Sequence, residues 1–271
     1  MLKVATYNIQ YGARRREVFQ SIGQLKEEGC QVLCLQEAHD REVGSQLGSA
    51  ILRELGPGWD GVFFLGTGPA LGLATFWAKD ALELHALQRQ KLPQLDRRPV
   101  WGRVSGQRPQ ERGALSVIGE AAHGPLRITN MHLDWQGGYT HRMRQVEACI
   151  KMLGERRYEG AEILCGDFNT CGPAVMYRRY KKHLYPLLNT FHDAFPELSW
   201  SYDIRELDCV AWGKYQWFIR AARAAGIHYR QRLDHVFYQG LELLDAECKR
   251  WNGSDHCPLV VSFVPVQNKS L

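Results

Sequence analysis

The sequence has no cysteine pair in C-x-x-C spacing, and its 8 cysteines are scattered along 271 residues. Structural zinc sites usually carry such closely spaced ligands, so zinc ligation is a weak alternative to free thiols. The amino-terminal segment also lacks the basic stretch, the long apolar stretch and the cleavage site of a secretory signal. We therefore expect a cytoplasmic protein whose cysteines stay reduced.

The chain also lacks an unbroken apolar run that could cross a membrane. Its longest uncharged window, 61–78, is interrupted by glycines and a proline, which is typical of two short strands joined by a turn. We expect no stable membrane insertion, and no feature indicates an obligate protein partner. A composition of 45% hydrophobic and 23% charged residues excludes disorder and fibres. The net charge of +5 permits an anionic partner without identifying one.

Helical and extended patterns alternate along the chain. Apolar runs rich in β-branched and aromatic residues predict strands at 3–7, 32–35, 61–65, 72–77, 100–104, 113–119, 126–131, 162–165, 235–238 and 259–264. Helical periodicity predicts helices at 15–28, 42–55, 138–157, 174–188 and 212–225. This order favours an α/β (α+β) protein in which two mixed sheets pack together with helices outside. We expect one domain over 1–265 and a short tail at 266–271.

Polar side chains stand where several of these apolar runs stop. Asn8, Glu37 and His132 each end a run, and Asp167 with Asn169 follows another. One such residue alone is usually a solvated strand end or a helix cap. Their number indicates a functional site instead.

Two Asp–His neighbourhoods lie near the carboxyl end, at 234–235 and 255–256. Mg²⁺ prefers carboxylate and amide oxygens and leaves room for water and substrate phosphate, and Asn8, Glu37 and Asp255 can supply such oxygens. A histidine oriented by an aspartate is a suitable base or transition-state stabiliser near neutral pH. His256 with Asp234 fits that role.

Six short motifs occur in a fixed order along nearly the whole chain. They are TYN at 6–8, LQE at 35–37, MHL at 131–133, GDFN at 166–169, LDH at 233–235 and SDH at 254–256. In this order the sequence resembles the endonuclease/exonuclease/phosphatase superfamily. The resemblance implies a DNase I-like four-layer αββα sandwich. It also implies Mg²⁺-dependent hydrolysis of phosphoesters without a covalent enzyme intermediate, with Mn²⁺ able to substitute.

The resemblance further assigns roles to single residues. It places Asn8, Glu37 and Asp255 at the metal. Asp167 and Asn169 are expected to position or activate the attacking water, and Asn169 also to hold phosphate oxygens. One versus two metal ions is left open.

Three more residues complete the expected site. His256, held by Asp234, is expected to be the general base or the phosphate stabiliser. His132 is expected to be the second catalytic imidazole and to bind the phosphoryl group, and which histidine does which is left open. Arg112 resembles a position near the substrate phosphate, where a guanidinium offers a bidentate fork, and its alternative is a charge at a strand edge.

The substrate must be read from the loops, because the superfamily hydrolyses DNA, RNA, sphingomyelin, inositol phosphates and other phosphoesters. The segment 170–232 carries ten Lys and Arg against five acids, interleaved with nine Tyr and Trp. Such a mixture can neutralise phosphates and stack bases. We therefore favour a phosphodiesterase that acts on nucleic acid, as an endonuclease or exonuclease. The part from Tyr177 to Arg232 is expected to form a wall of the cleft.

Other interpretations stay open. The aromatic residues could face the core and the charges water, as on ordinary helices. The substrate could instead be a lipid head group, as in sphingomyelinases, an inositol phosphate or another small phosphoester. A catalytically silent binding module is disfavoured because every expected catalytic position is filled.

Overall fold

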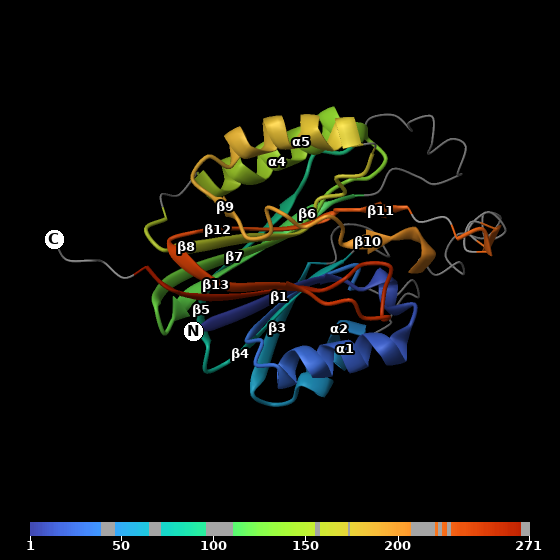
Figure 1. Ribbon diagram of the computed structural model, residues 1–271. Helices are drawn as coiled ribbons and strands as arrows, with labels where there is room; N and C mark the ends of the chain where they lie inside the picture. The colour runs from blue at the N-terminus through green and yellow to red at the C-terminus, as the bar shows by residue number, and fades with distance from the viewer. Residues whose placement is uncertain are drawn as a thin grey trace.

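The structure is a computed structural model that describes residues 1–38, 47–64, 72–95, 111–154, 158–172, 174–206 and 229–266, with short pieces at 220–221 and 224–226. Two six-stranded sheets pack face to face, and helices cover the outer face of each (Figure 1). The result is the four-layer αββα sandwich that the sequence predicts. Among the described residues, no helix is both long and apolar enough to cross a membrane.

The first sheet has the strand order β13-β14-β1-β2-β4-β3. Its strands are β1 (Leu2–Asn8), β2 (Val32–Gln36), β3 (Trp59–Phe64), β4 (Leu73–Ala78), β13 (Leu241–Cys248) and β14 (Leu259–Pro265). Strands β1 and β2 are parallel and are joined through α1 (Arg15–Glu27), whereas the other pairs are antiparallel. Helices α1 and α2 (Leu47–Leu55) bury their apolar sides against the outer face of this sheet.

The second sheet has the order β5-β6-β7-β8-β12-β9. Its strands are β5 (Leu82–Lys91), β6 (Gly113–Ala121), β7 (Gly124–His132), β8 (Ala161–Asp167), β9 (His192–Asp193) and β12 (Asp234–Gln239). Strands β7 and β8 are parallel and are joined through α4 (Gly138–Gly154). Helix α5 (Ala174–Leu187) lies beside α4 on the outer face (Figure 1).

A buried amide pair links the two sheets. Gln36 Nε2 donates a hydrogen bond to Asn130 Oδ1 at 2.8 Å, and Asn130 Nδ2 donates to the carbonyls of Leu35 and Ala74 at 3.0 Å each. The surrounding interface is apolar, so a slide of one sheet over the other would leave these amides without partners. The pair therefore favours one relative position of the sheets.

Two long strands, β5 and β13, are not among those that the sequence predicts. Both are edge strands, and most of their residues are half-buried or exposed, so neither needs an apolar run. The sequence pattern also does not predict three strands of two residues each: β9, β10 (Tyr202–Asp203) and β11 (Arg230–Gln231). The predicted strand 100–104 and most of the predicted helix 212–225 lie outside the described residues.

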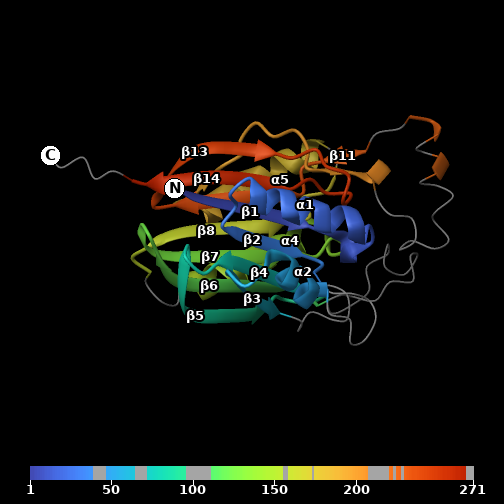
Figure 2. The same ribbon diagram turned by 90° about the horizontal axis from the view of Figure 1, so that it is seen from below.

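The carboxyl ends of β1, β2, β7 and β8 meet at one end of the sandwich, the right-hand end in Figures 1 and 2. A contact between the ends of β1 and β8 confirms this: Asn8 Nδ2 lies 3.0 Å from Asp167 Oδ2. The side chains that follow these strands therefore share one site between the two sheets.

Candidate active site

All nine side chains that the sequence predicts for the site gather at this end. The first sheet contributes Asn8 at the end of β1, Glu37 directly after β2, and Asp255 and His256 just before β14. The second sheet contributes Arg112 before β6, His132 at the end of β7, Asp167 and Asn169 at and after the end of β8, and Asp234 at the start of β12. Eight of the nine are buried, and Glu37 keeps a small exposed fraction.

Asp167 is the centre of the hydrogen-bond network. Its Oδ2 accepts from Asn8 Nδ2 at 3.0 Å and from Asn169 Nδ2 at 3.2 Å, and its Oδ1 accepts from the Asn169 backbone N–H at 2.8 Å. His132 Nε2 lies 3.3 Å from Oδ2. Burial alone would raise the pKa of Asp167, but the bond to His132 and the field of His256 hold it well below its usual value. Asp167 is therefore a carboxylate at neutral pH.

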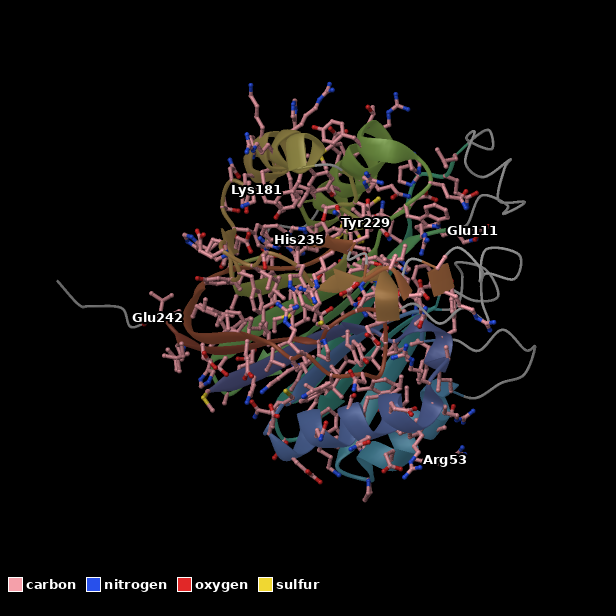
Figure 3. All side chains as sticks on the ribbon, turned by 45° about the vertical axis from the view of Figure 1, so that its right-hand side comes forward. Arg53, Glu111, Lys181, Tyr229, His235 and Glu242 are labelled. Carbon is pink, nitrogen blue, oxygen red and sulfur yellow. The ribbon has the colours of Figure 1, made fainter. Side chains whose placement is uncertain are left out.

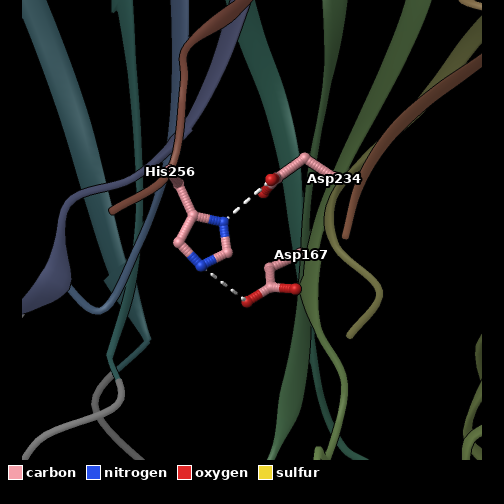
Figure 4. A group of neighbouring side chains, drawn as sticks. All are labelled: Asp167, Asp234 and His256. Atoms are coloured by element: carbon pink, nitrogen blue, oxygen red, sulfur yellow. Dashed lines mark hydrogen bonds and ion pairs between the residues drawn. The ribbon is translucent and has the colours of Figure 1, made fainter. Parts of the chain in front are cut away.

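His256 lies between two carboxylates (Figure 4). Its Nδ1 donates to Asp234 Oδ2 at 2.8 Å, and its Nε2 lies 3.9 Å from Asp167 Oδ2. Burial would lower the pKa of His256, but the two carboxylates raise it well above its usual value. One ligand atom from each of these three residues lies within 4.8 Å of the other two, so the group could also hold a metal ion.

Ser201 is a part of the site that the sequence analysis missed. Its hydroxyl donates to Asp234 Oδ2 at 2.7 Å and accepts from the backbone N–H groups of Leu233 and Asp234 at 3.0 Å each. The side chain is fully buried, so these bonds fix the carboxylate that holds His256. A serine in a polar loop, outside every motif, gave no signal in the sequence.

Glu37 carries the most perturbed carboxyl of the metal-binding set that the sequence predicts. Burial is the main reason that its pKa rises to about 7, and the neighbouring Asp255 and Asp167 carboxylates add to the rise against the opposing Arg112 and His256. Its backbone also lies in the left-handed region, with φ of 55°, which is strained for a residue with a side chain. A divalent cation would remove the repulsion among these carboxylates, and oxygen donors are what Mg²⁺ prefers. The donor set thus fits a hard divalent cation.

Asn8 has a different orientation from that of a simple metal ligand. Its amide nitrogen donates to Asp167, and its Oδ1 accepts the backbone N–H of Gln10 at 3.0 Å. Asn8 therefore orients Asp167 directly, and its oxygen has one remaining lone pair for a cation.

Arg112 and His132 form a contacting pair at the second-sheet side of the site. Arg112 Nη1 lies 2.8 Å from His132 Nδ1 and 2.6 Å from Nε2, and His132 Nε2 lies 3.9 Å from Glu37 Oε1. Burial and the guanidinium charge lower the pKa of His132 to about 4. His132 is consequently neutral at pH 7, whereas Arg112 brings a buried positive charge into the site.

The predicted basic and aromatic wall divides into two parts. Helix α5 lies on the outer face of the second sheet (Figure 1), where Tyr180 is buried in the core and the Tyr185 hydroxyl donates to Asp193 at 2.6 Å. The aromatic residues of this helix therefore follow the ordinary core-facing pattern. By contrast, the ring centroid of Tyr202 lies 5.1 Å from that of His256, so the ribbon β10–β11 borders the site. Residues 207–219 of the predicted wall lie outside the described residues.

Comparisons with solved structures support this fold. A structure titled endonuclease/exonuclease/phosphatase from Bacteroides vulgatus has a TM-score of 0.68 and 16% identity, covering 97% of this chain and 98% of that one. A mannosyl-6-phosphatase from Bacteroides thetaiotaomicron has a TM-score of 0.65 and 15% identity, with coverage of 97% and 100%. ANGEL2, a 2',3'-cyclic phosphatase, has a TM-score of 0.64 and 15% identity, with coverage of 97% and 94%. At these identities the likeness shows the fold alone.

Sequence comparisons give the family. Two UPF0294 proteins of Vibrio vulnificus, from strains YJ016 and CMCP6, are each 31% identical to the chain over 140 residues. The aligned stretch covers 51% of this chain and 39% of each relative, so the chain spans well under half the length of these relatives. The family match extends over residues 5–256, which includes every candidate site residue. The chain belongs to the Endonuclease/Exonuclease/phosphatase family.

Proposed function

We propose that the chain is a divalent-cation-dependent phosphoester hydrolase that uses Mg²⁺, with Mn²⁺ able to replace it. One observation carries this proposal. The Glu37, Asp167 and Asp255 carboxylates gather beside the His256–Asp234 pair in one buried site, and burial, with the neighbouring carboxylates adding to it, raises the pKa of Glu37 to about 7. Burying several like charges is costly unless a cation binds among them.

The residue roles follow from the charges at the site. Glu37 and Asp255, with the oxygen of Asn8, would hold the cation, which when bound polarises a phosphoryl oxygen. Asp167 is ionised and is oriented by Asn8 and Asn169, so it is the group that can accept a proton from the attacking water.

Two cationic groups and one neutral imidazole then face the phosphate. His256 carries a proton and can donate a hydrogen bond from Nε2 to the charge that develops on phosphoryl oxygens. Arg112 adds its guanidinium charge, and neutral His132 lies between Arg112 and Asp167 and orients both groups toward the phosphate. Asn169 Nδ2 donates to the Leu133 carbonyl at 2.8 Å and to Asp167 Oδ2 at 3.2 Å, so its amide orients Asp167 beside the phosphate.

Nucleic acid is the substrate class that the surface beside the site favours. Arg230 and Arg250 both contact the ring of Trp200, with their Cζ atoms 4.4 Å and 3.5 Å from its centroid. We name these three residues the arginine–tryptophan cluster. Tyr229, next to Arg230, is 43% exposed. Exposed arginines and an exposed aromatic ring suit a strand with phosphates and bases.

The arginine–tryptophan cluster is attached to the catalytic residues through the backbone. Tyr202 forms a backbone bridge with His256, and the Asp203 N–H donates to the Asp255 carbonyl at 3.0 Å. Trp200 lies two residues before Tyr202, so a strand lying on the cluster would approach the phosphate site. By their titles the similar folds include a mannosyl-6-phosphatase and a 2',3'-cyclic phosphatase, so a small phosphoester is the second candidate.

The test compares hydrolysis of an oligonucleotide with that of a small chromogenic phosphodiester in Mg²⁺. Glu37→Gln should abolish both activities. Arg230→Gln combined with Arg250→Gln should weaken oligonucleotide binding and reduce its salt slope by about 1.4 for a single strand, since each lost phosphate contact lowers the slope by about 0.7. The small substrate should be unaffected.

Arg53→Gln is the matched control, because Arg53 lies on α2 at the bottom of Figure 3, away from Tyr229. It should leave the slope unchanged. If the double variant changes both substrates equally, or if no oligonucleotide is cleaved while inositol phosphates or sphingomyelin are, the nucleic-acid assignment is wrong.

A further inference from the structure

Two cysteines outside the catalytic network lie side by side at the edge of the first sheet. Cys248 is the last residue of β13, and it pairs in register with Leu259 of β14, two residues after Cys257. The Lys249 N–H donates to the Pro258 carbonyl at 2.9 Å, which keeps the two segments together. The two thiols are neighbours whose interaction raises the pKa of Cys248 and lowers that of Cys257.

Their polar surroundings place both sulfur atoms around one carbonyl group. Cys248 Sγ lies 3.9 Å from the Trp200 carbonyl oxygen. Arg250 Nη1 donates to the same oxygen at 2.9 Å and lies 3.6 Å from Cys257 Sγ. Both sulfurs therefore lie beside the same Trp200 carbonyl and Arg250 guanidinium.

Partial exposure of one member separates this pair from the buried Cys34–Cys165 pair, and Cys171 is the other half-buried thiol in the described part of the chain. Cys34 and Cys165 also interact, but both are fully buried in the core between the sheets. Cys30 and Cys149 are buried without a thiol partner. Cys248 is only half-buried, so a small oxidant can reach it.

We propose that Cys248 and Cys257 form a reversible disulfide that lowers hydrolysis at the neighbouring site. Hydrogen peroxide oxidises one of the two thiols to a sulfenic acid and is reduced to one water. The sulfur of the other cysteine then attacks the sulfenic sulfur, the S–S bond forms, and the sulfenic hydroxyl leaves with the second thiol proton as another water. A small dithiol reverses the step by thiol–disulfide exchange.

The link to activity is the position of Cys257. It directly follows His256, and its N–H donates to the Ser201 carbonyl at 2.7 Å, while the Ser201 hydroxyl holds Asp234. Closing a thiol contact to the about 2.05 Å of a disulfide draws this segment toward β13. A displacement of about 1 Å at a catalytic group can cost about a hundredfold in rate. This part of the inference rests on the proposed function, whereas disulfide formation does not.

The experiment treats the full chain with hydrogen peroxide and analyses a non-reduced digest by mass spectrometry. We expect a peptide that links Cys248 to Cys257, absent in Cys248→Ser and present in the matched control Cys30→Ser. Hydrolysis of a small phosphodiester should fall about a hundredfold in the oxidised wild type and return with dithiothreitol, while Cys248→Ser keeps its rate. Phenylarsine oxide, a probe of adjacent thiols, should bind the wild type and Cys30→Ser but not Cys248→Ser.

Two results would overturn the inference. The first is no linked peptide, with both thiols still free to react with an alkylating reagent. The second is equal inactivation of Cys248→Ser and the wild type, which would place the sensitive group elsewhere. If the untreated protein hydrolyses no phosphoester, the proposed function fails, and the digest and the arsenical still decide whether the thiols pair.

Discussion

Glu37→Gln should make the metal-free protein more stable while it removes metal-dependent activity. The substitution keeps the shape of the side chain and removes its ability to ionise. Glu37 is largely buried, and the Asp255 and Asp167 carboxylates face it. In the absence of a cation this negative charge destabilises the fold, and glutamine avoids that cost.

The size and the pH range follow from the pKa of Glu37. An ordinary glutamate carboxyl has a pKa of 4.5, and burial with the neighbouring carboxylates raises that of Glu37 to about 7. Between these values the folded chain holds a proton that the unfolded chain has lost, so stability falls as the pH rises from 4.5 to about 7. One pKa unit corresponds to about 1.4 kcal/mol, so the cost above pH 7 is about 3 kcal/mol. Metal-free Glu37→Gln should recover this amount at pH 8 and almost none of it below about pH 5.

Urea unfolding at pH 5 and pH 8, with a chelator or with Mg²⁺, measures these quantities. Mg²⁺ should stabilise the wild type at pH 8 because it binds the folded state, and should have little effect on Glu37→Gln. Glu242→Gln is the control, since Glu242 is exposed on the edge strand β13, at the left of the molecule in Figure 3. A Glu37→Gln variant that is no more stable than wild type at pH 8 without metal, or that Mg²⁺ stabilises equally, would refute the reasoning.

Three further predictions concern the groups that support the site. His256→Ala and Asp234→Ala should each lower the rate at least about a hundredfold, and the double variant should lose little more than the worse single variant, because the two residues act as a unit. Multiplicative losses in steady-state kinetics would contradict this. Ser201→Ala should lower kcat about tenfold with little change in KM and cost about 1 kcal/mol in urea unfolding, and Ser201→Thr should restore most of both. Gly166→Ala should fail to fold or lose several kcal/mol of stability, because its Cβ would lie 2.0 Å from the Met131 carbonyl oxygen. The control Gly124→Ala has a similarly positive φ but no atom within 4 Å of the added Cβ. It should cost only about 1 kcal/mol, measured by thermal unfolding.

Five of the nine candidate site residues could be located from the sequence because each stands at or just after the end of an apolar run. Asn8, His132 and Asp167 are the last residues of buried strands. Where a buried strand ends is set by local sequence, and parallel neighbours bring their carboxyl ends to the same edge. The chemical type and the position of these residues can therefore be inferred from the sequence before the fold is known.

Features that depend on tertiary neighbours could not be predicted in this way. Strand β5 is an edge strand that is exposed along most of its length, so nothing forces an apolar pattern on it. Ser201 gains its role only because the loop before β10 folds back over Asp234. Tyr180 looks like a ligand-binding aromatic in a basic segment, yet helical periodicity turns it into the core under α5.

The division of the site between two sheets explains why its centre is rigid while its border is the place for specificity. Glu37 follows Gln36, and His132 lies two residues after Asn130, so the buried amide pair fixes the distance between the first-sheet carboxylates and the second-sheet imidazole. An apolar pair at this place would pack as well, but it would tolerate a slide of one sheet over the other. The amides do not tolerate such a slide, because it would leave them buried without hydrogen-bond partners. The exposed Arg230 side chain on the ribbon β10–β11 bears no such constraint, because the described contacts between this ribbon and His256 and Asp255 come from Tyr202 and Asp203. Changes in that ribbon can therefore alter which phosphoester reaches the site without displacing the groups that act on phosphorus.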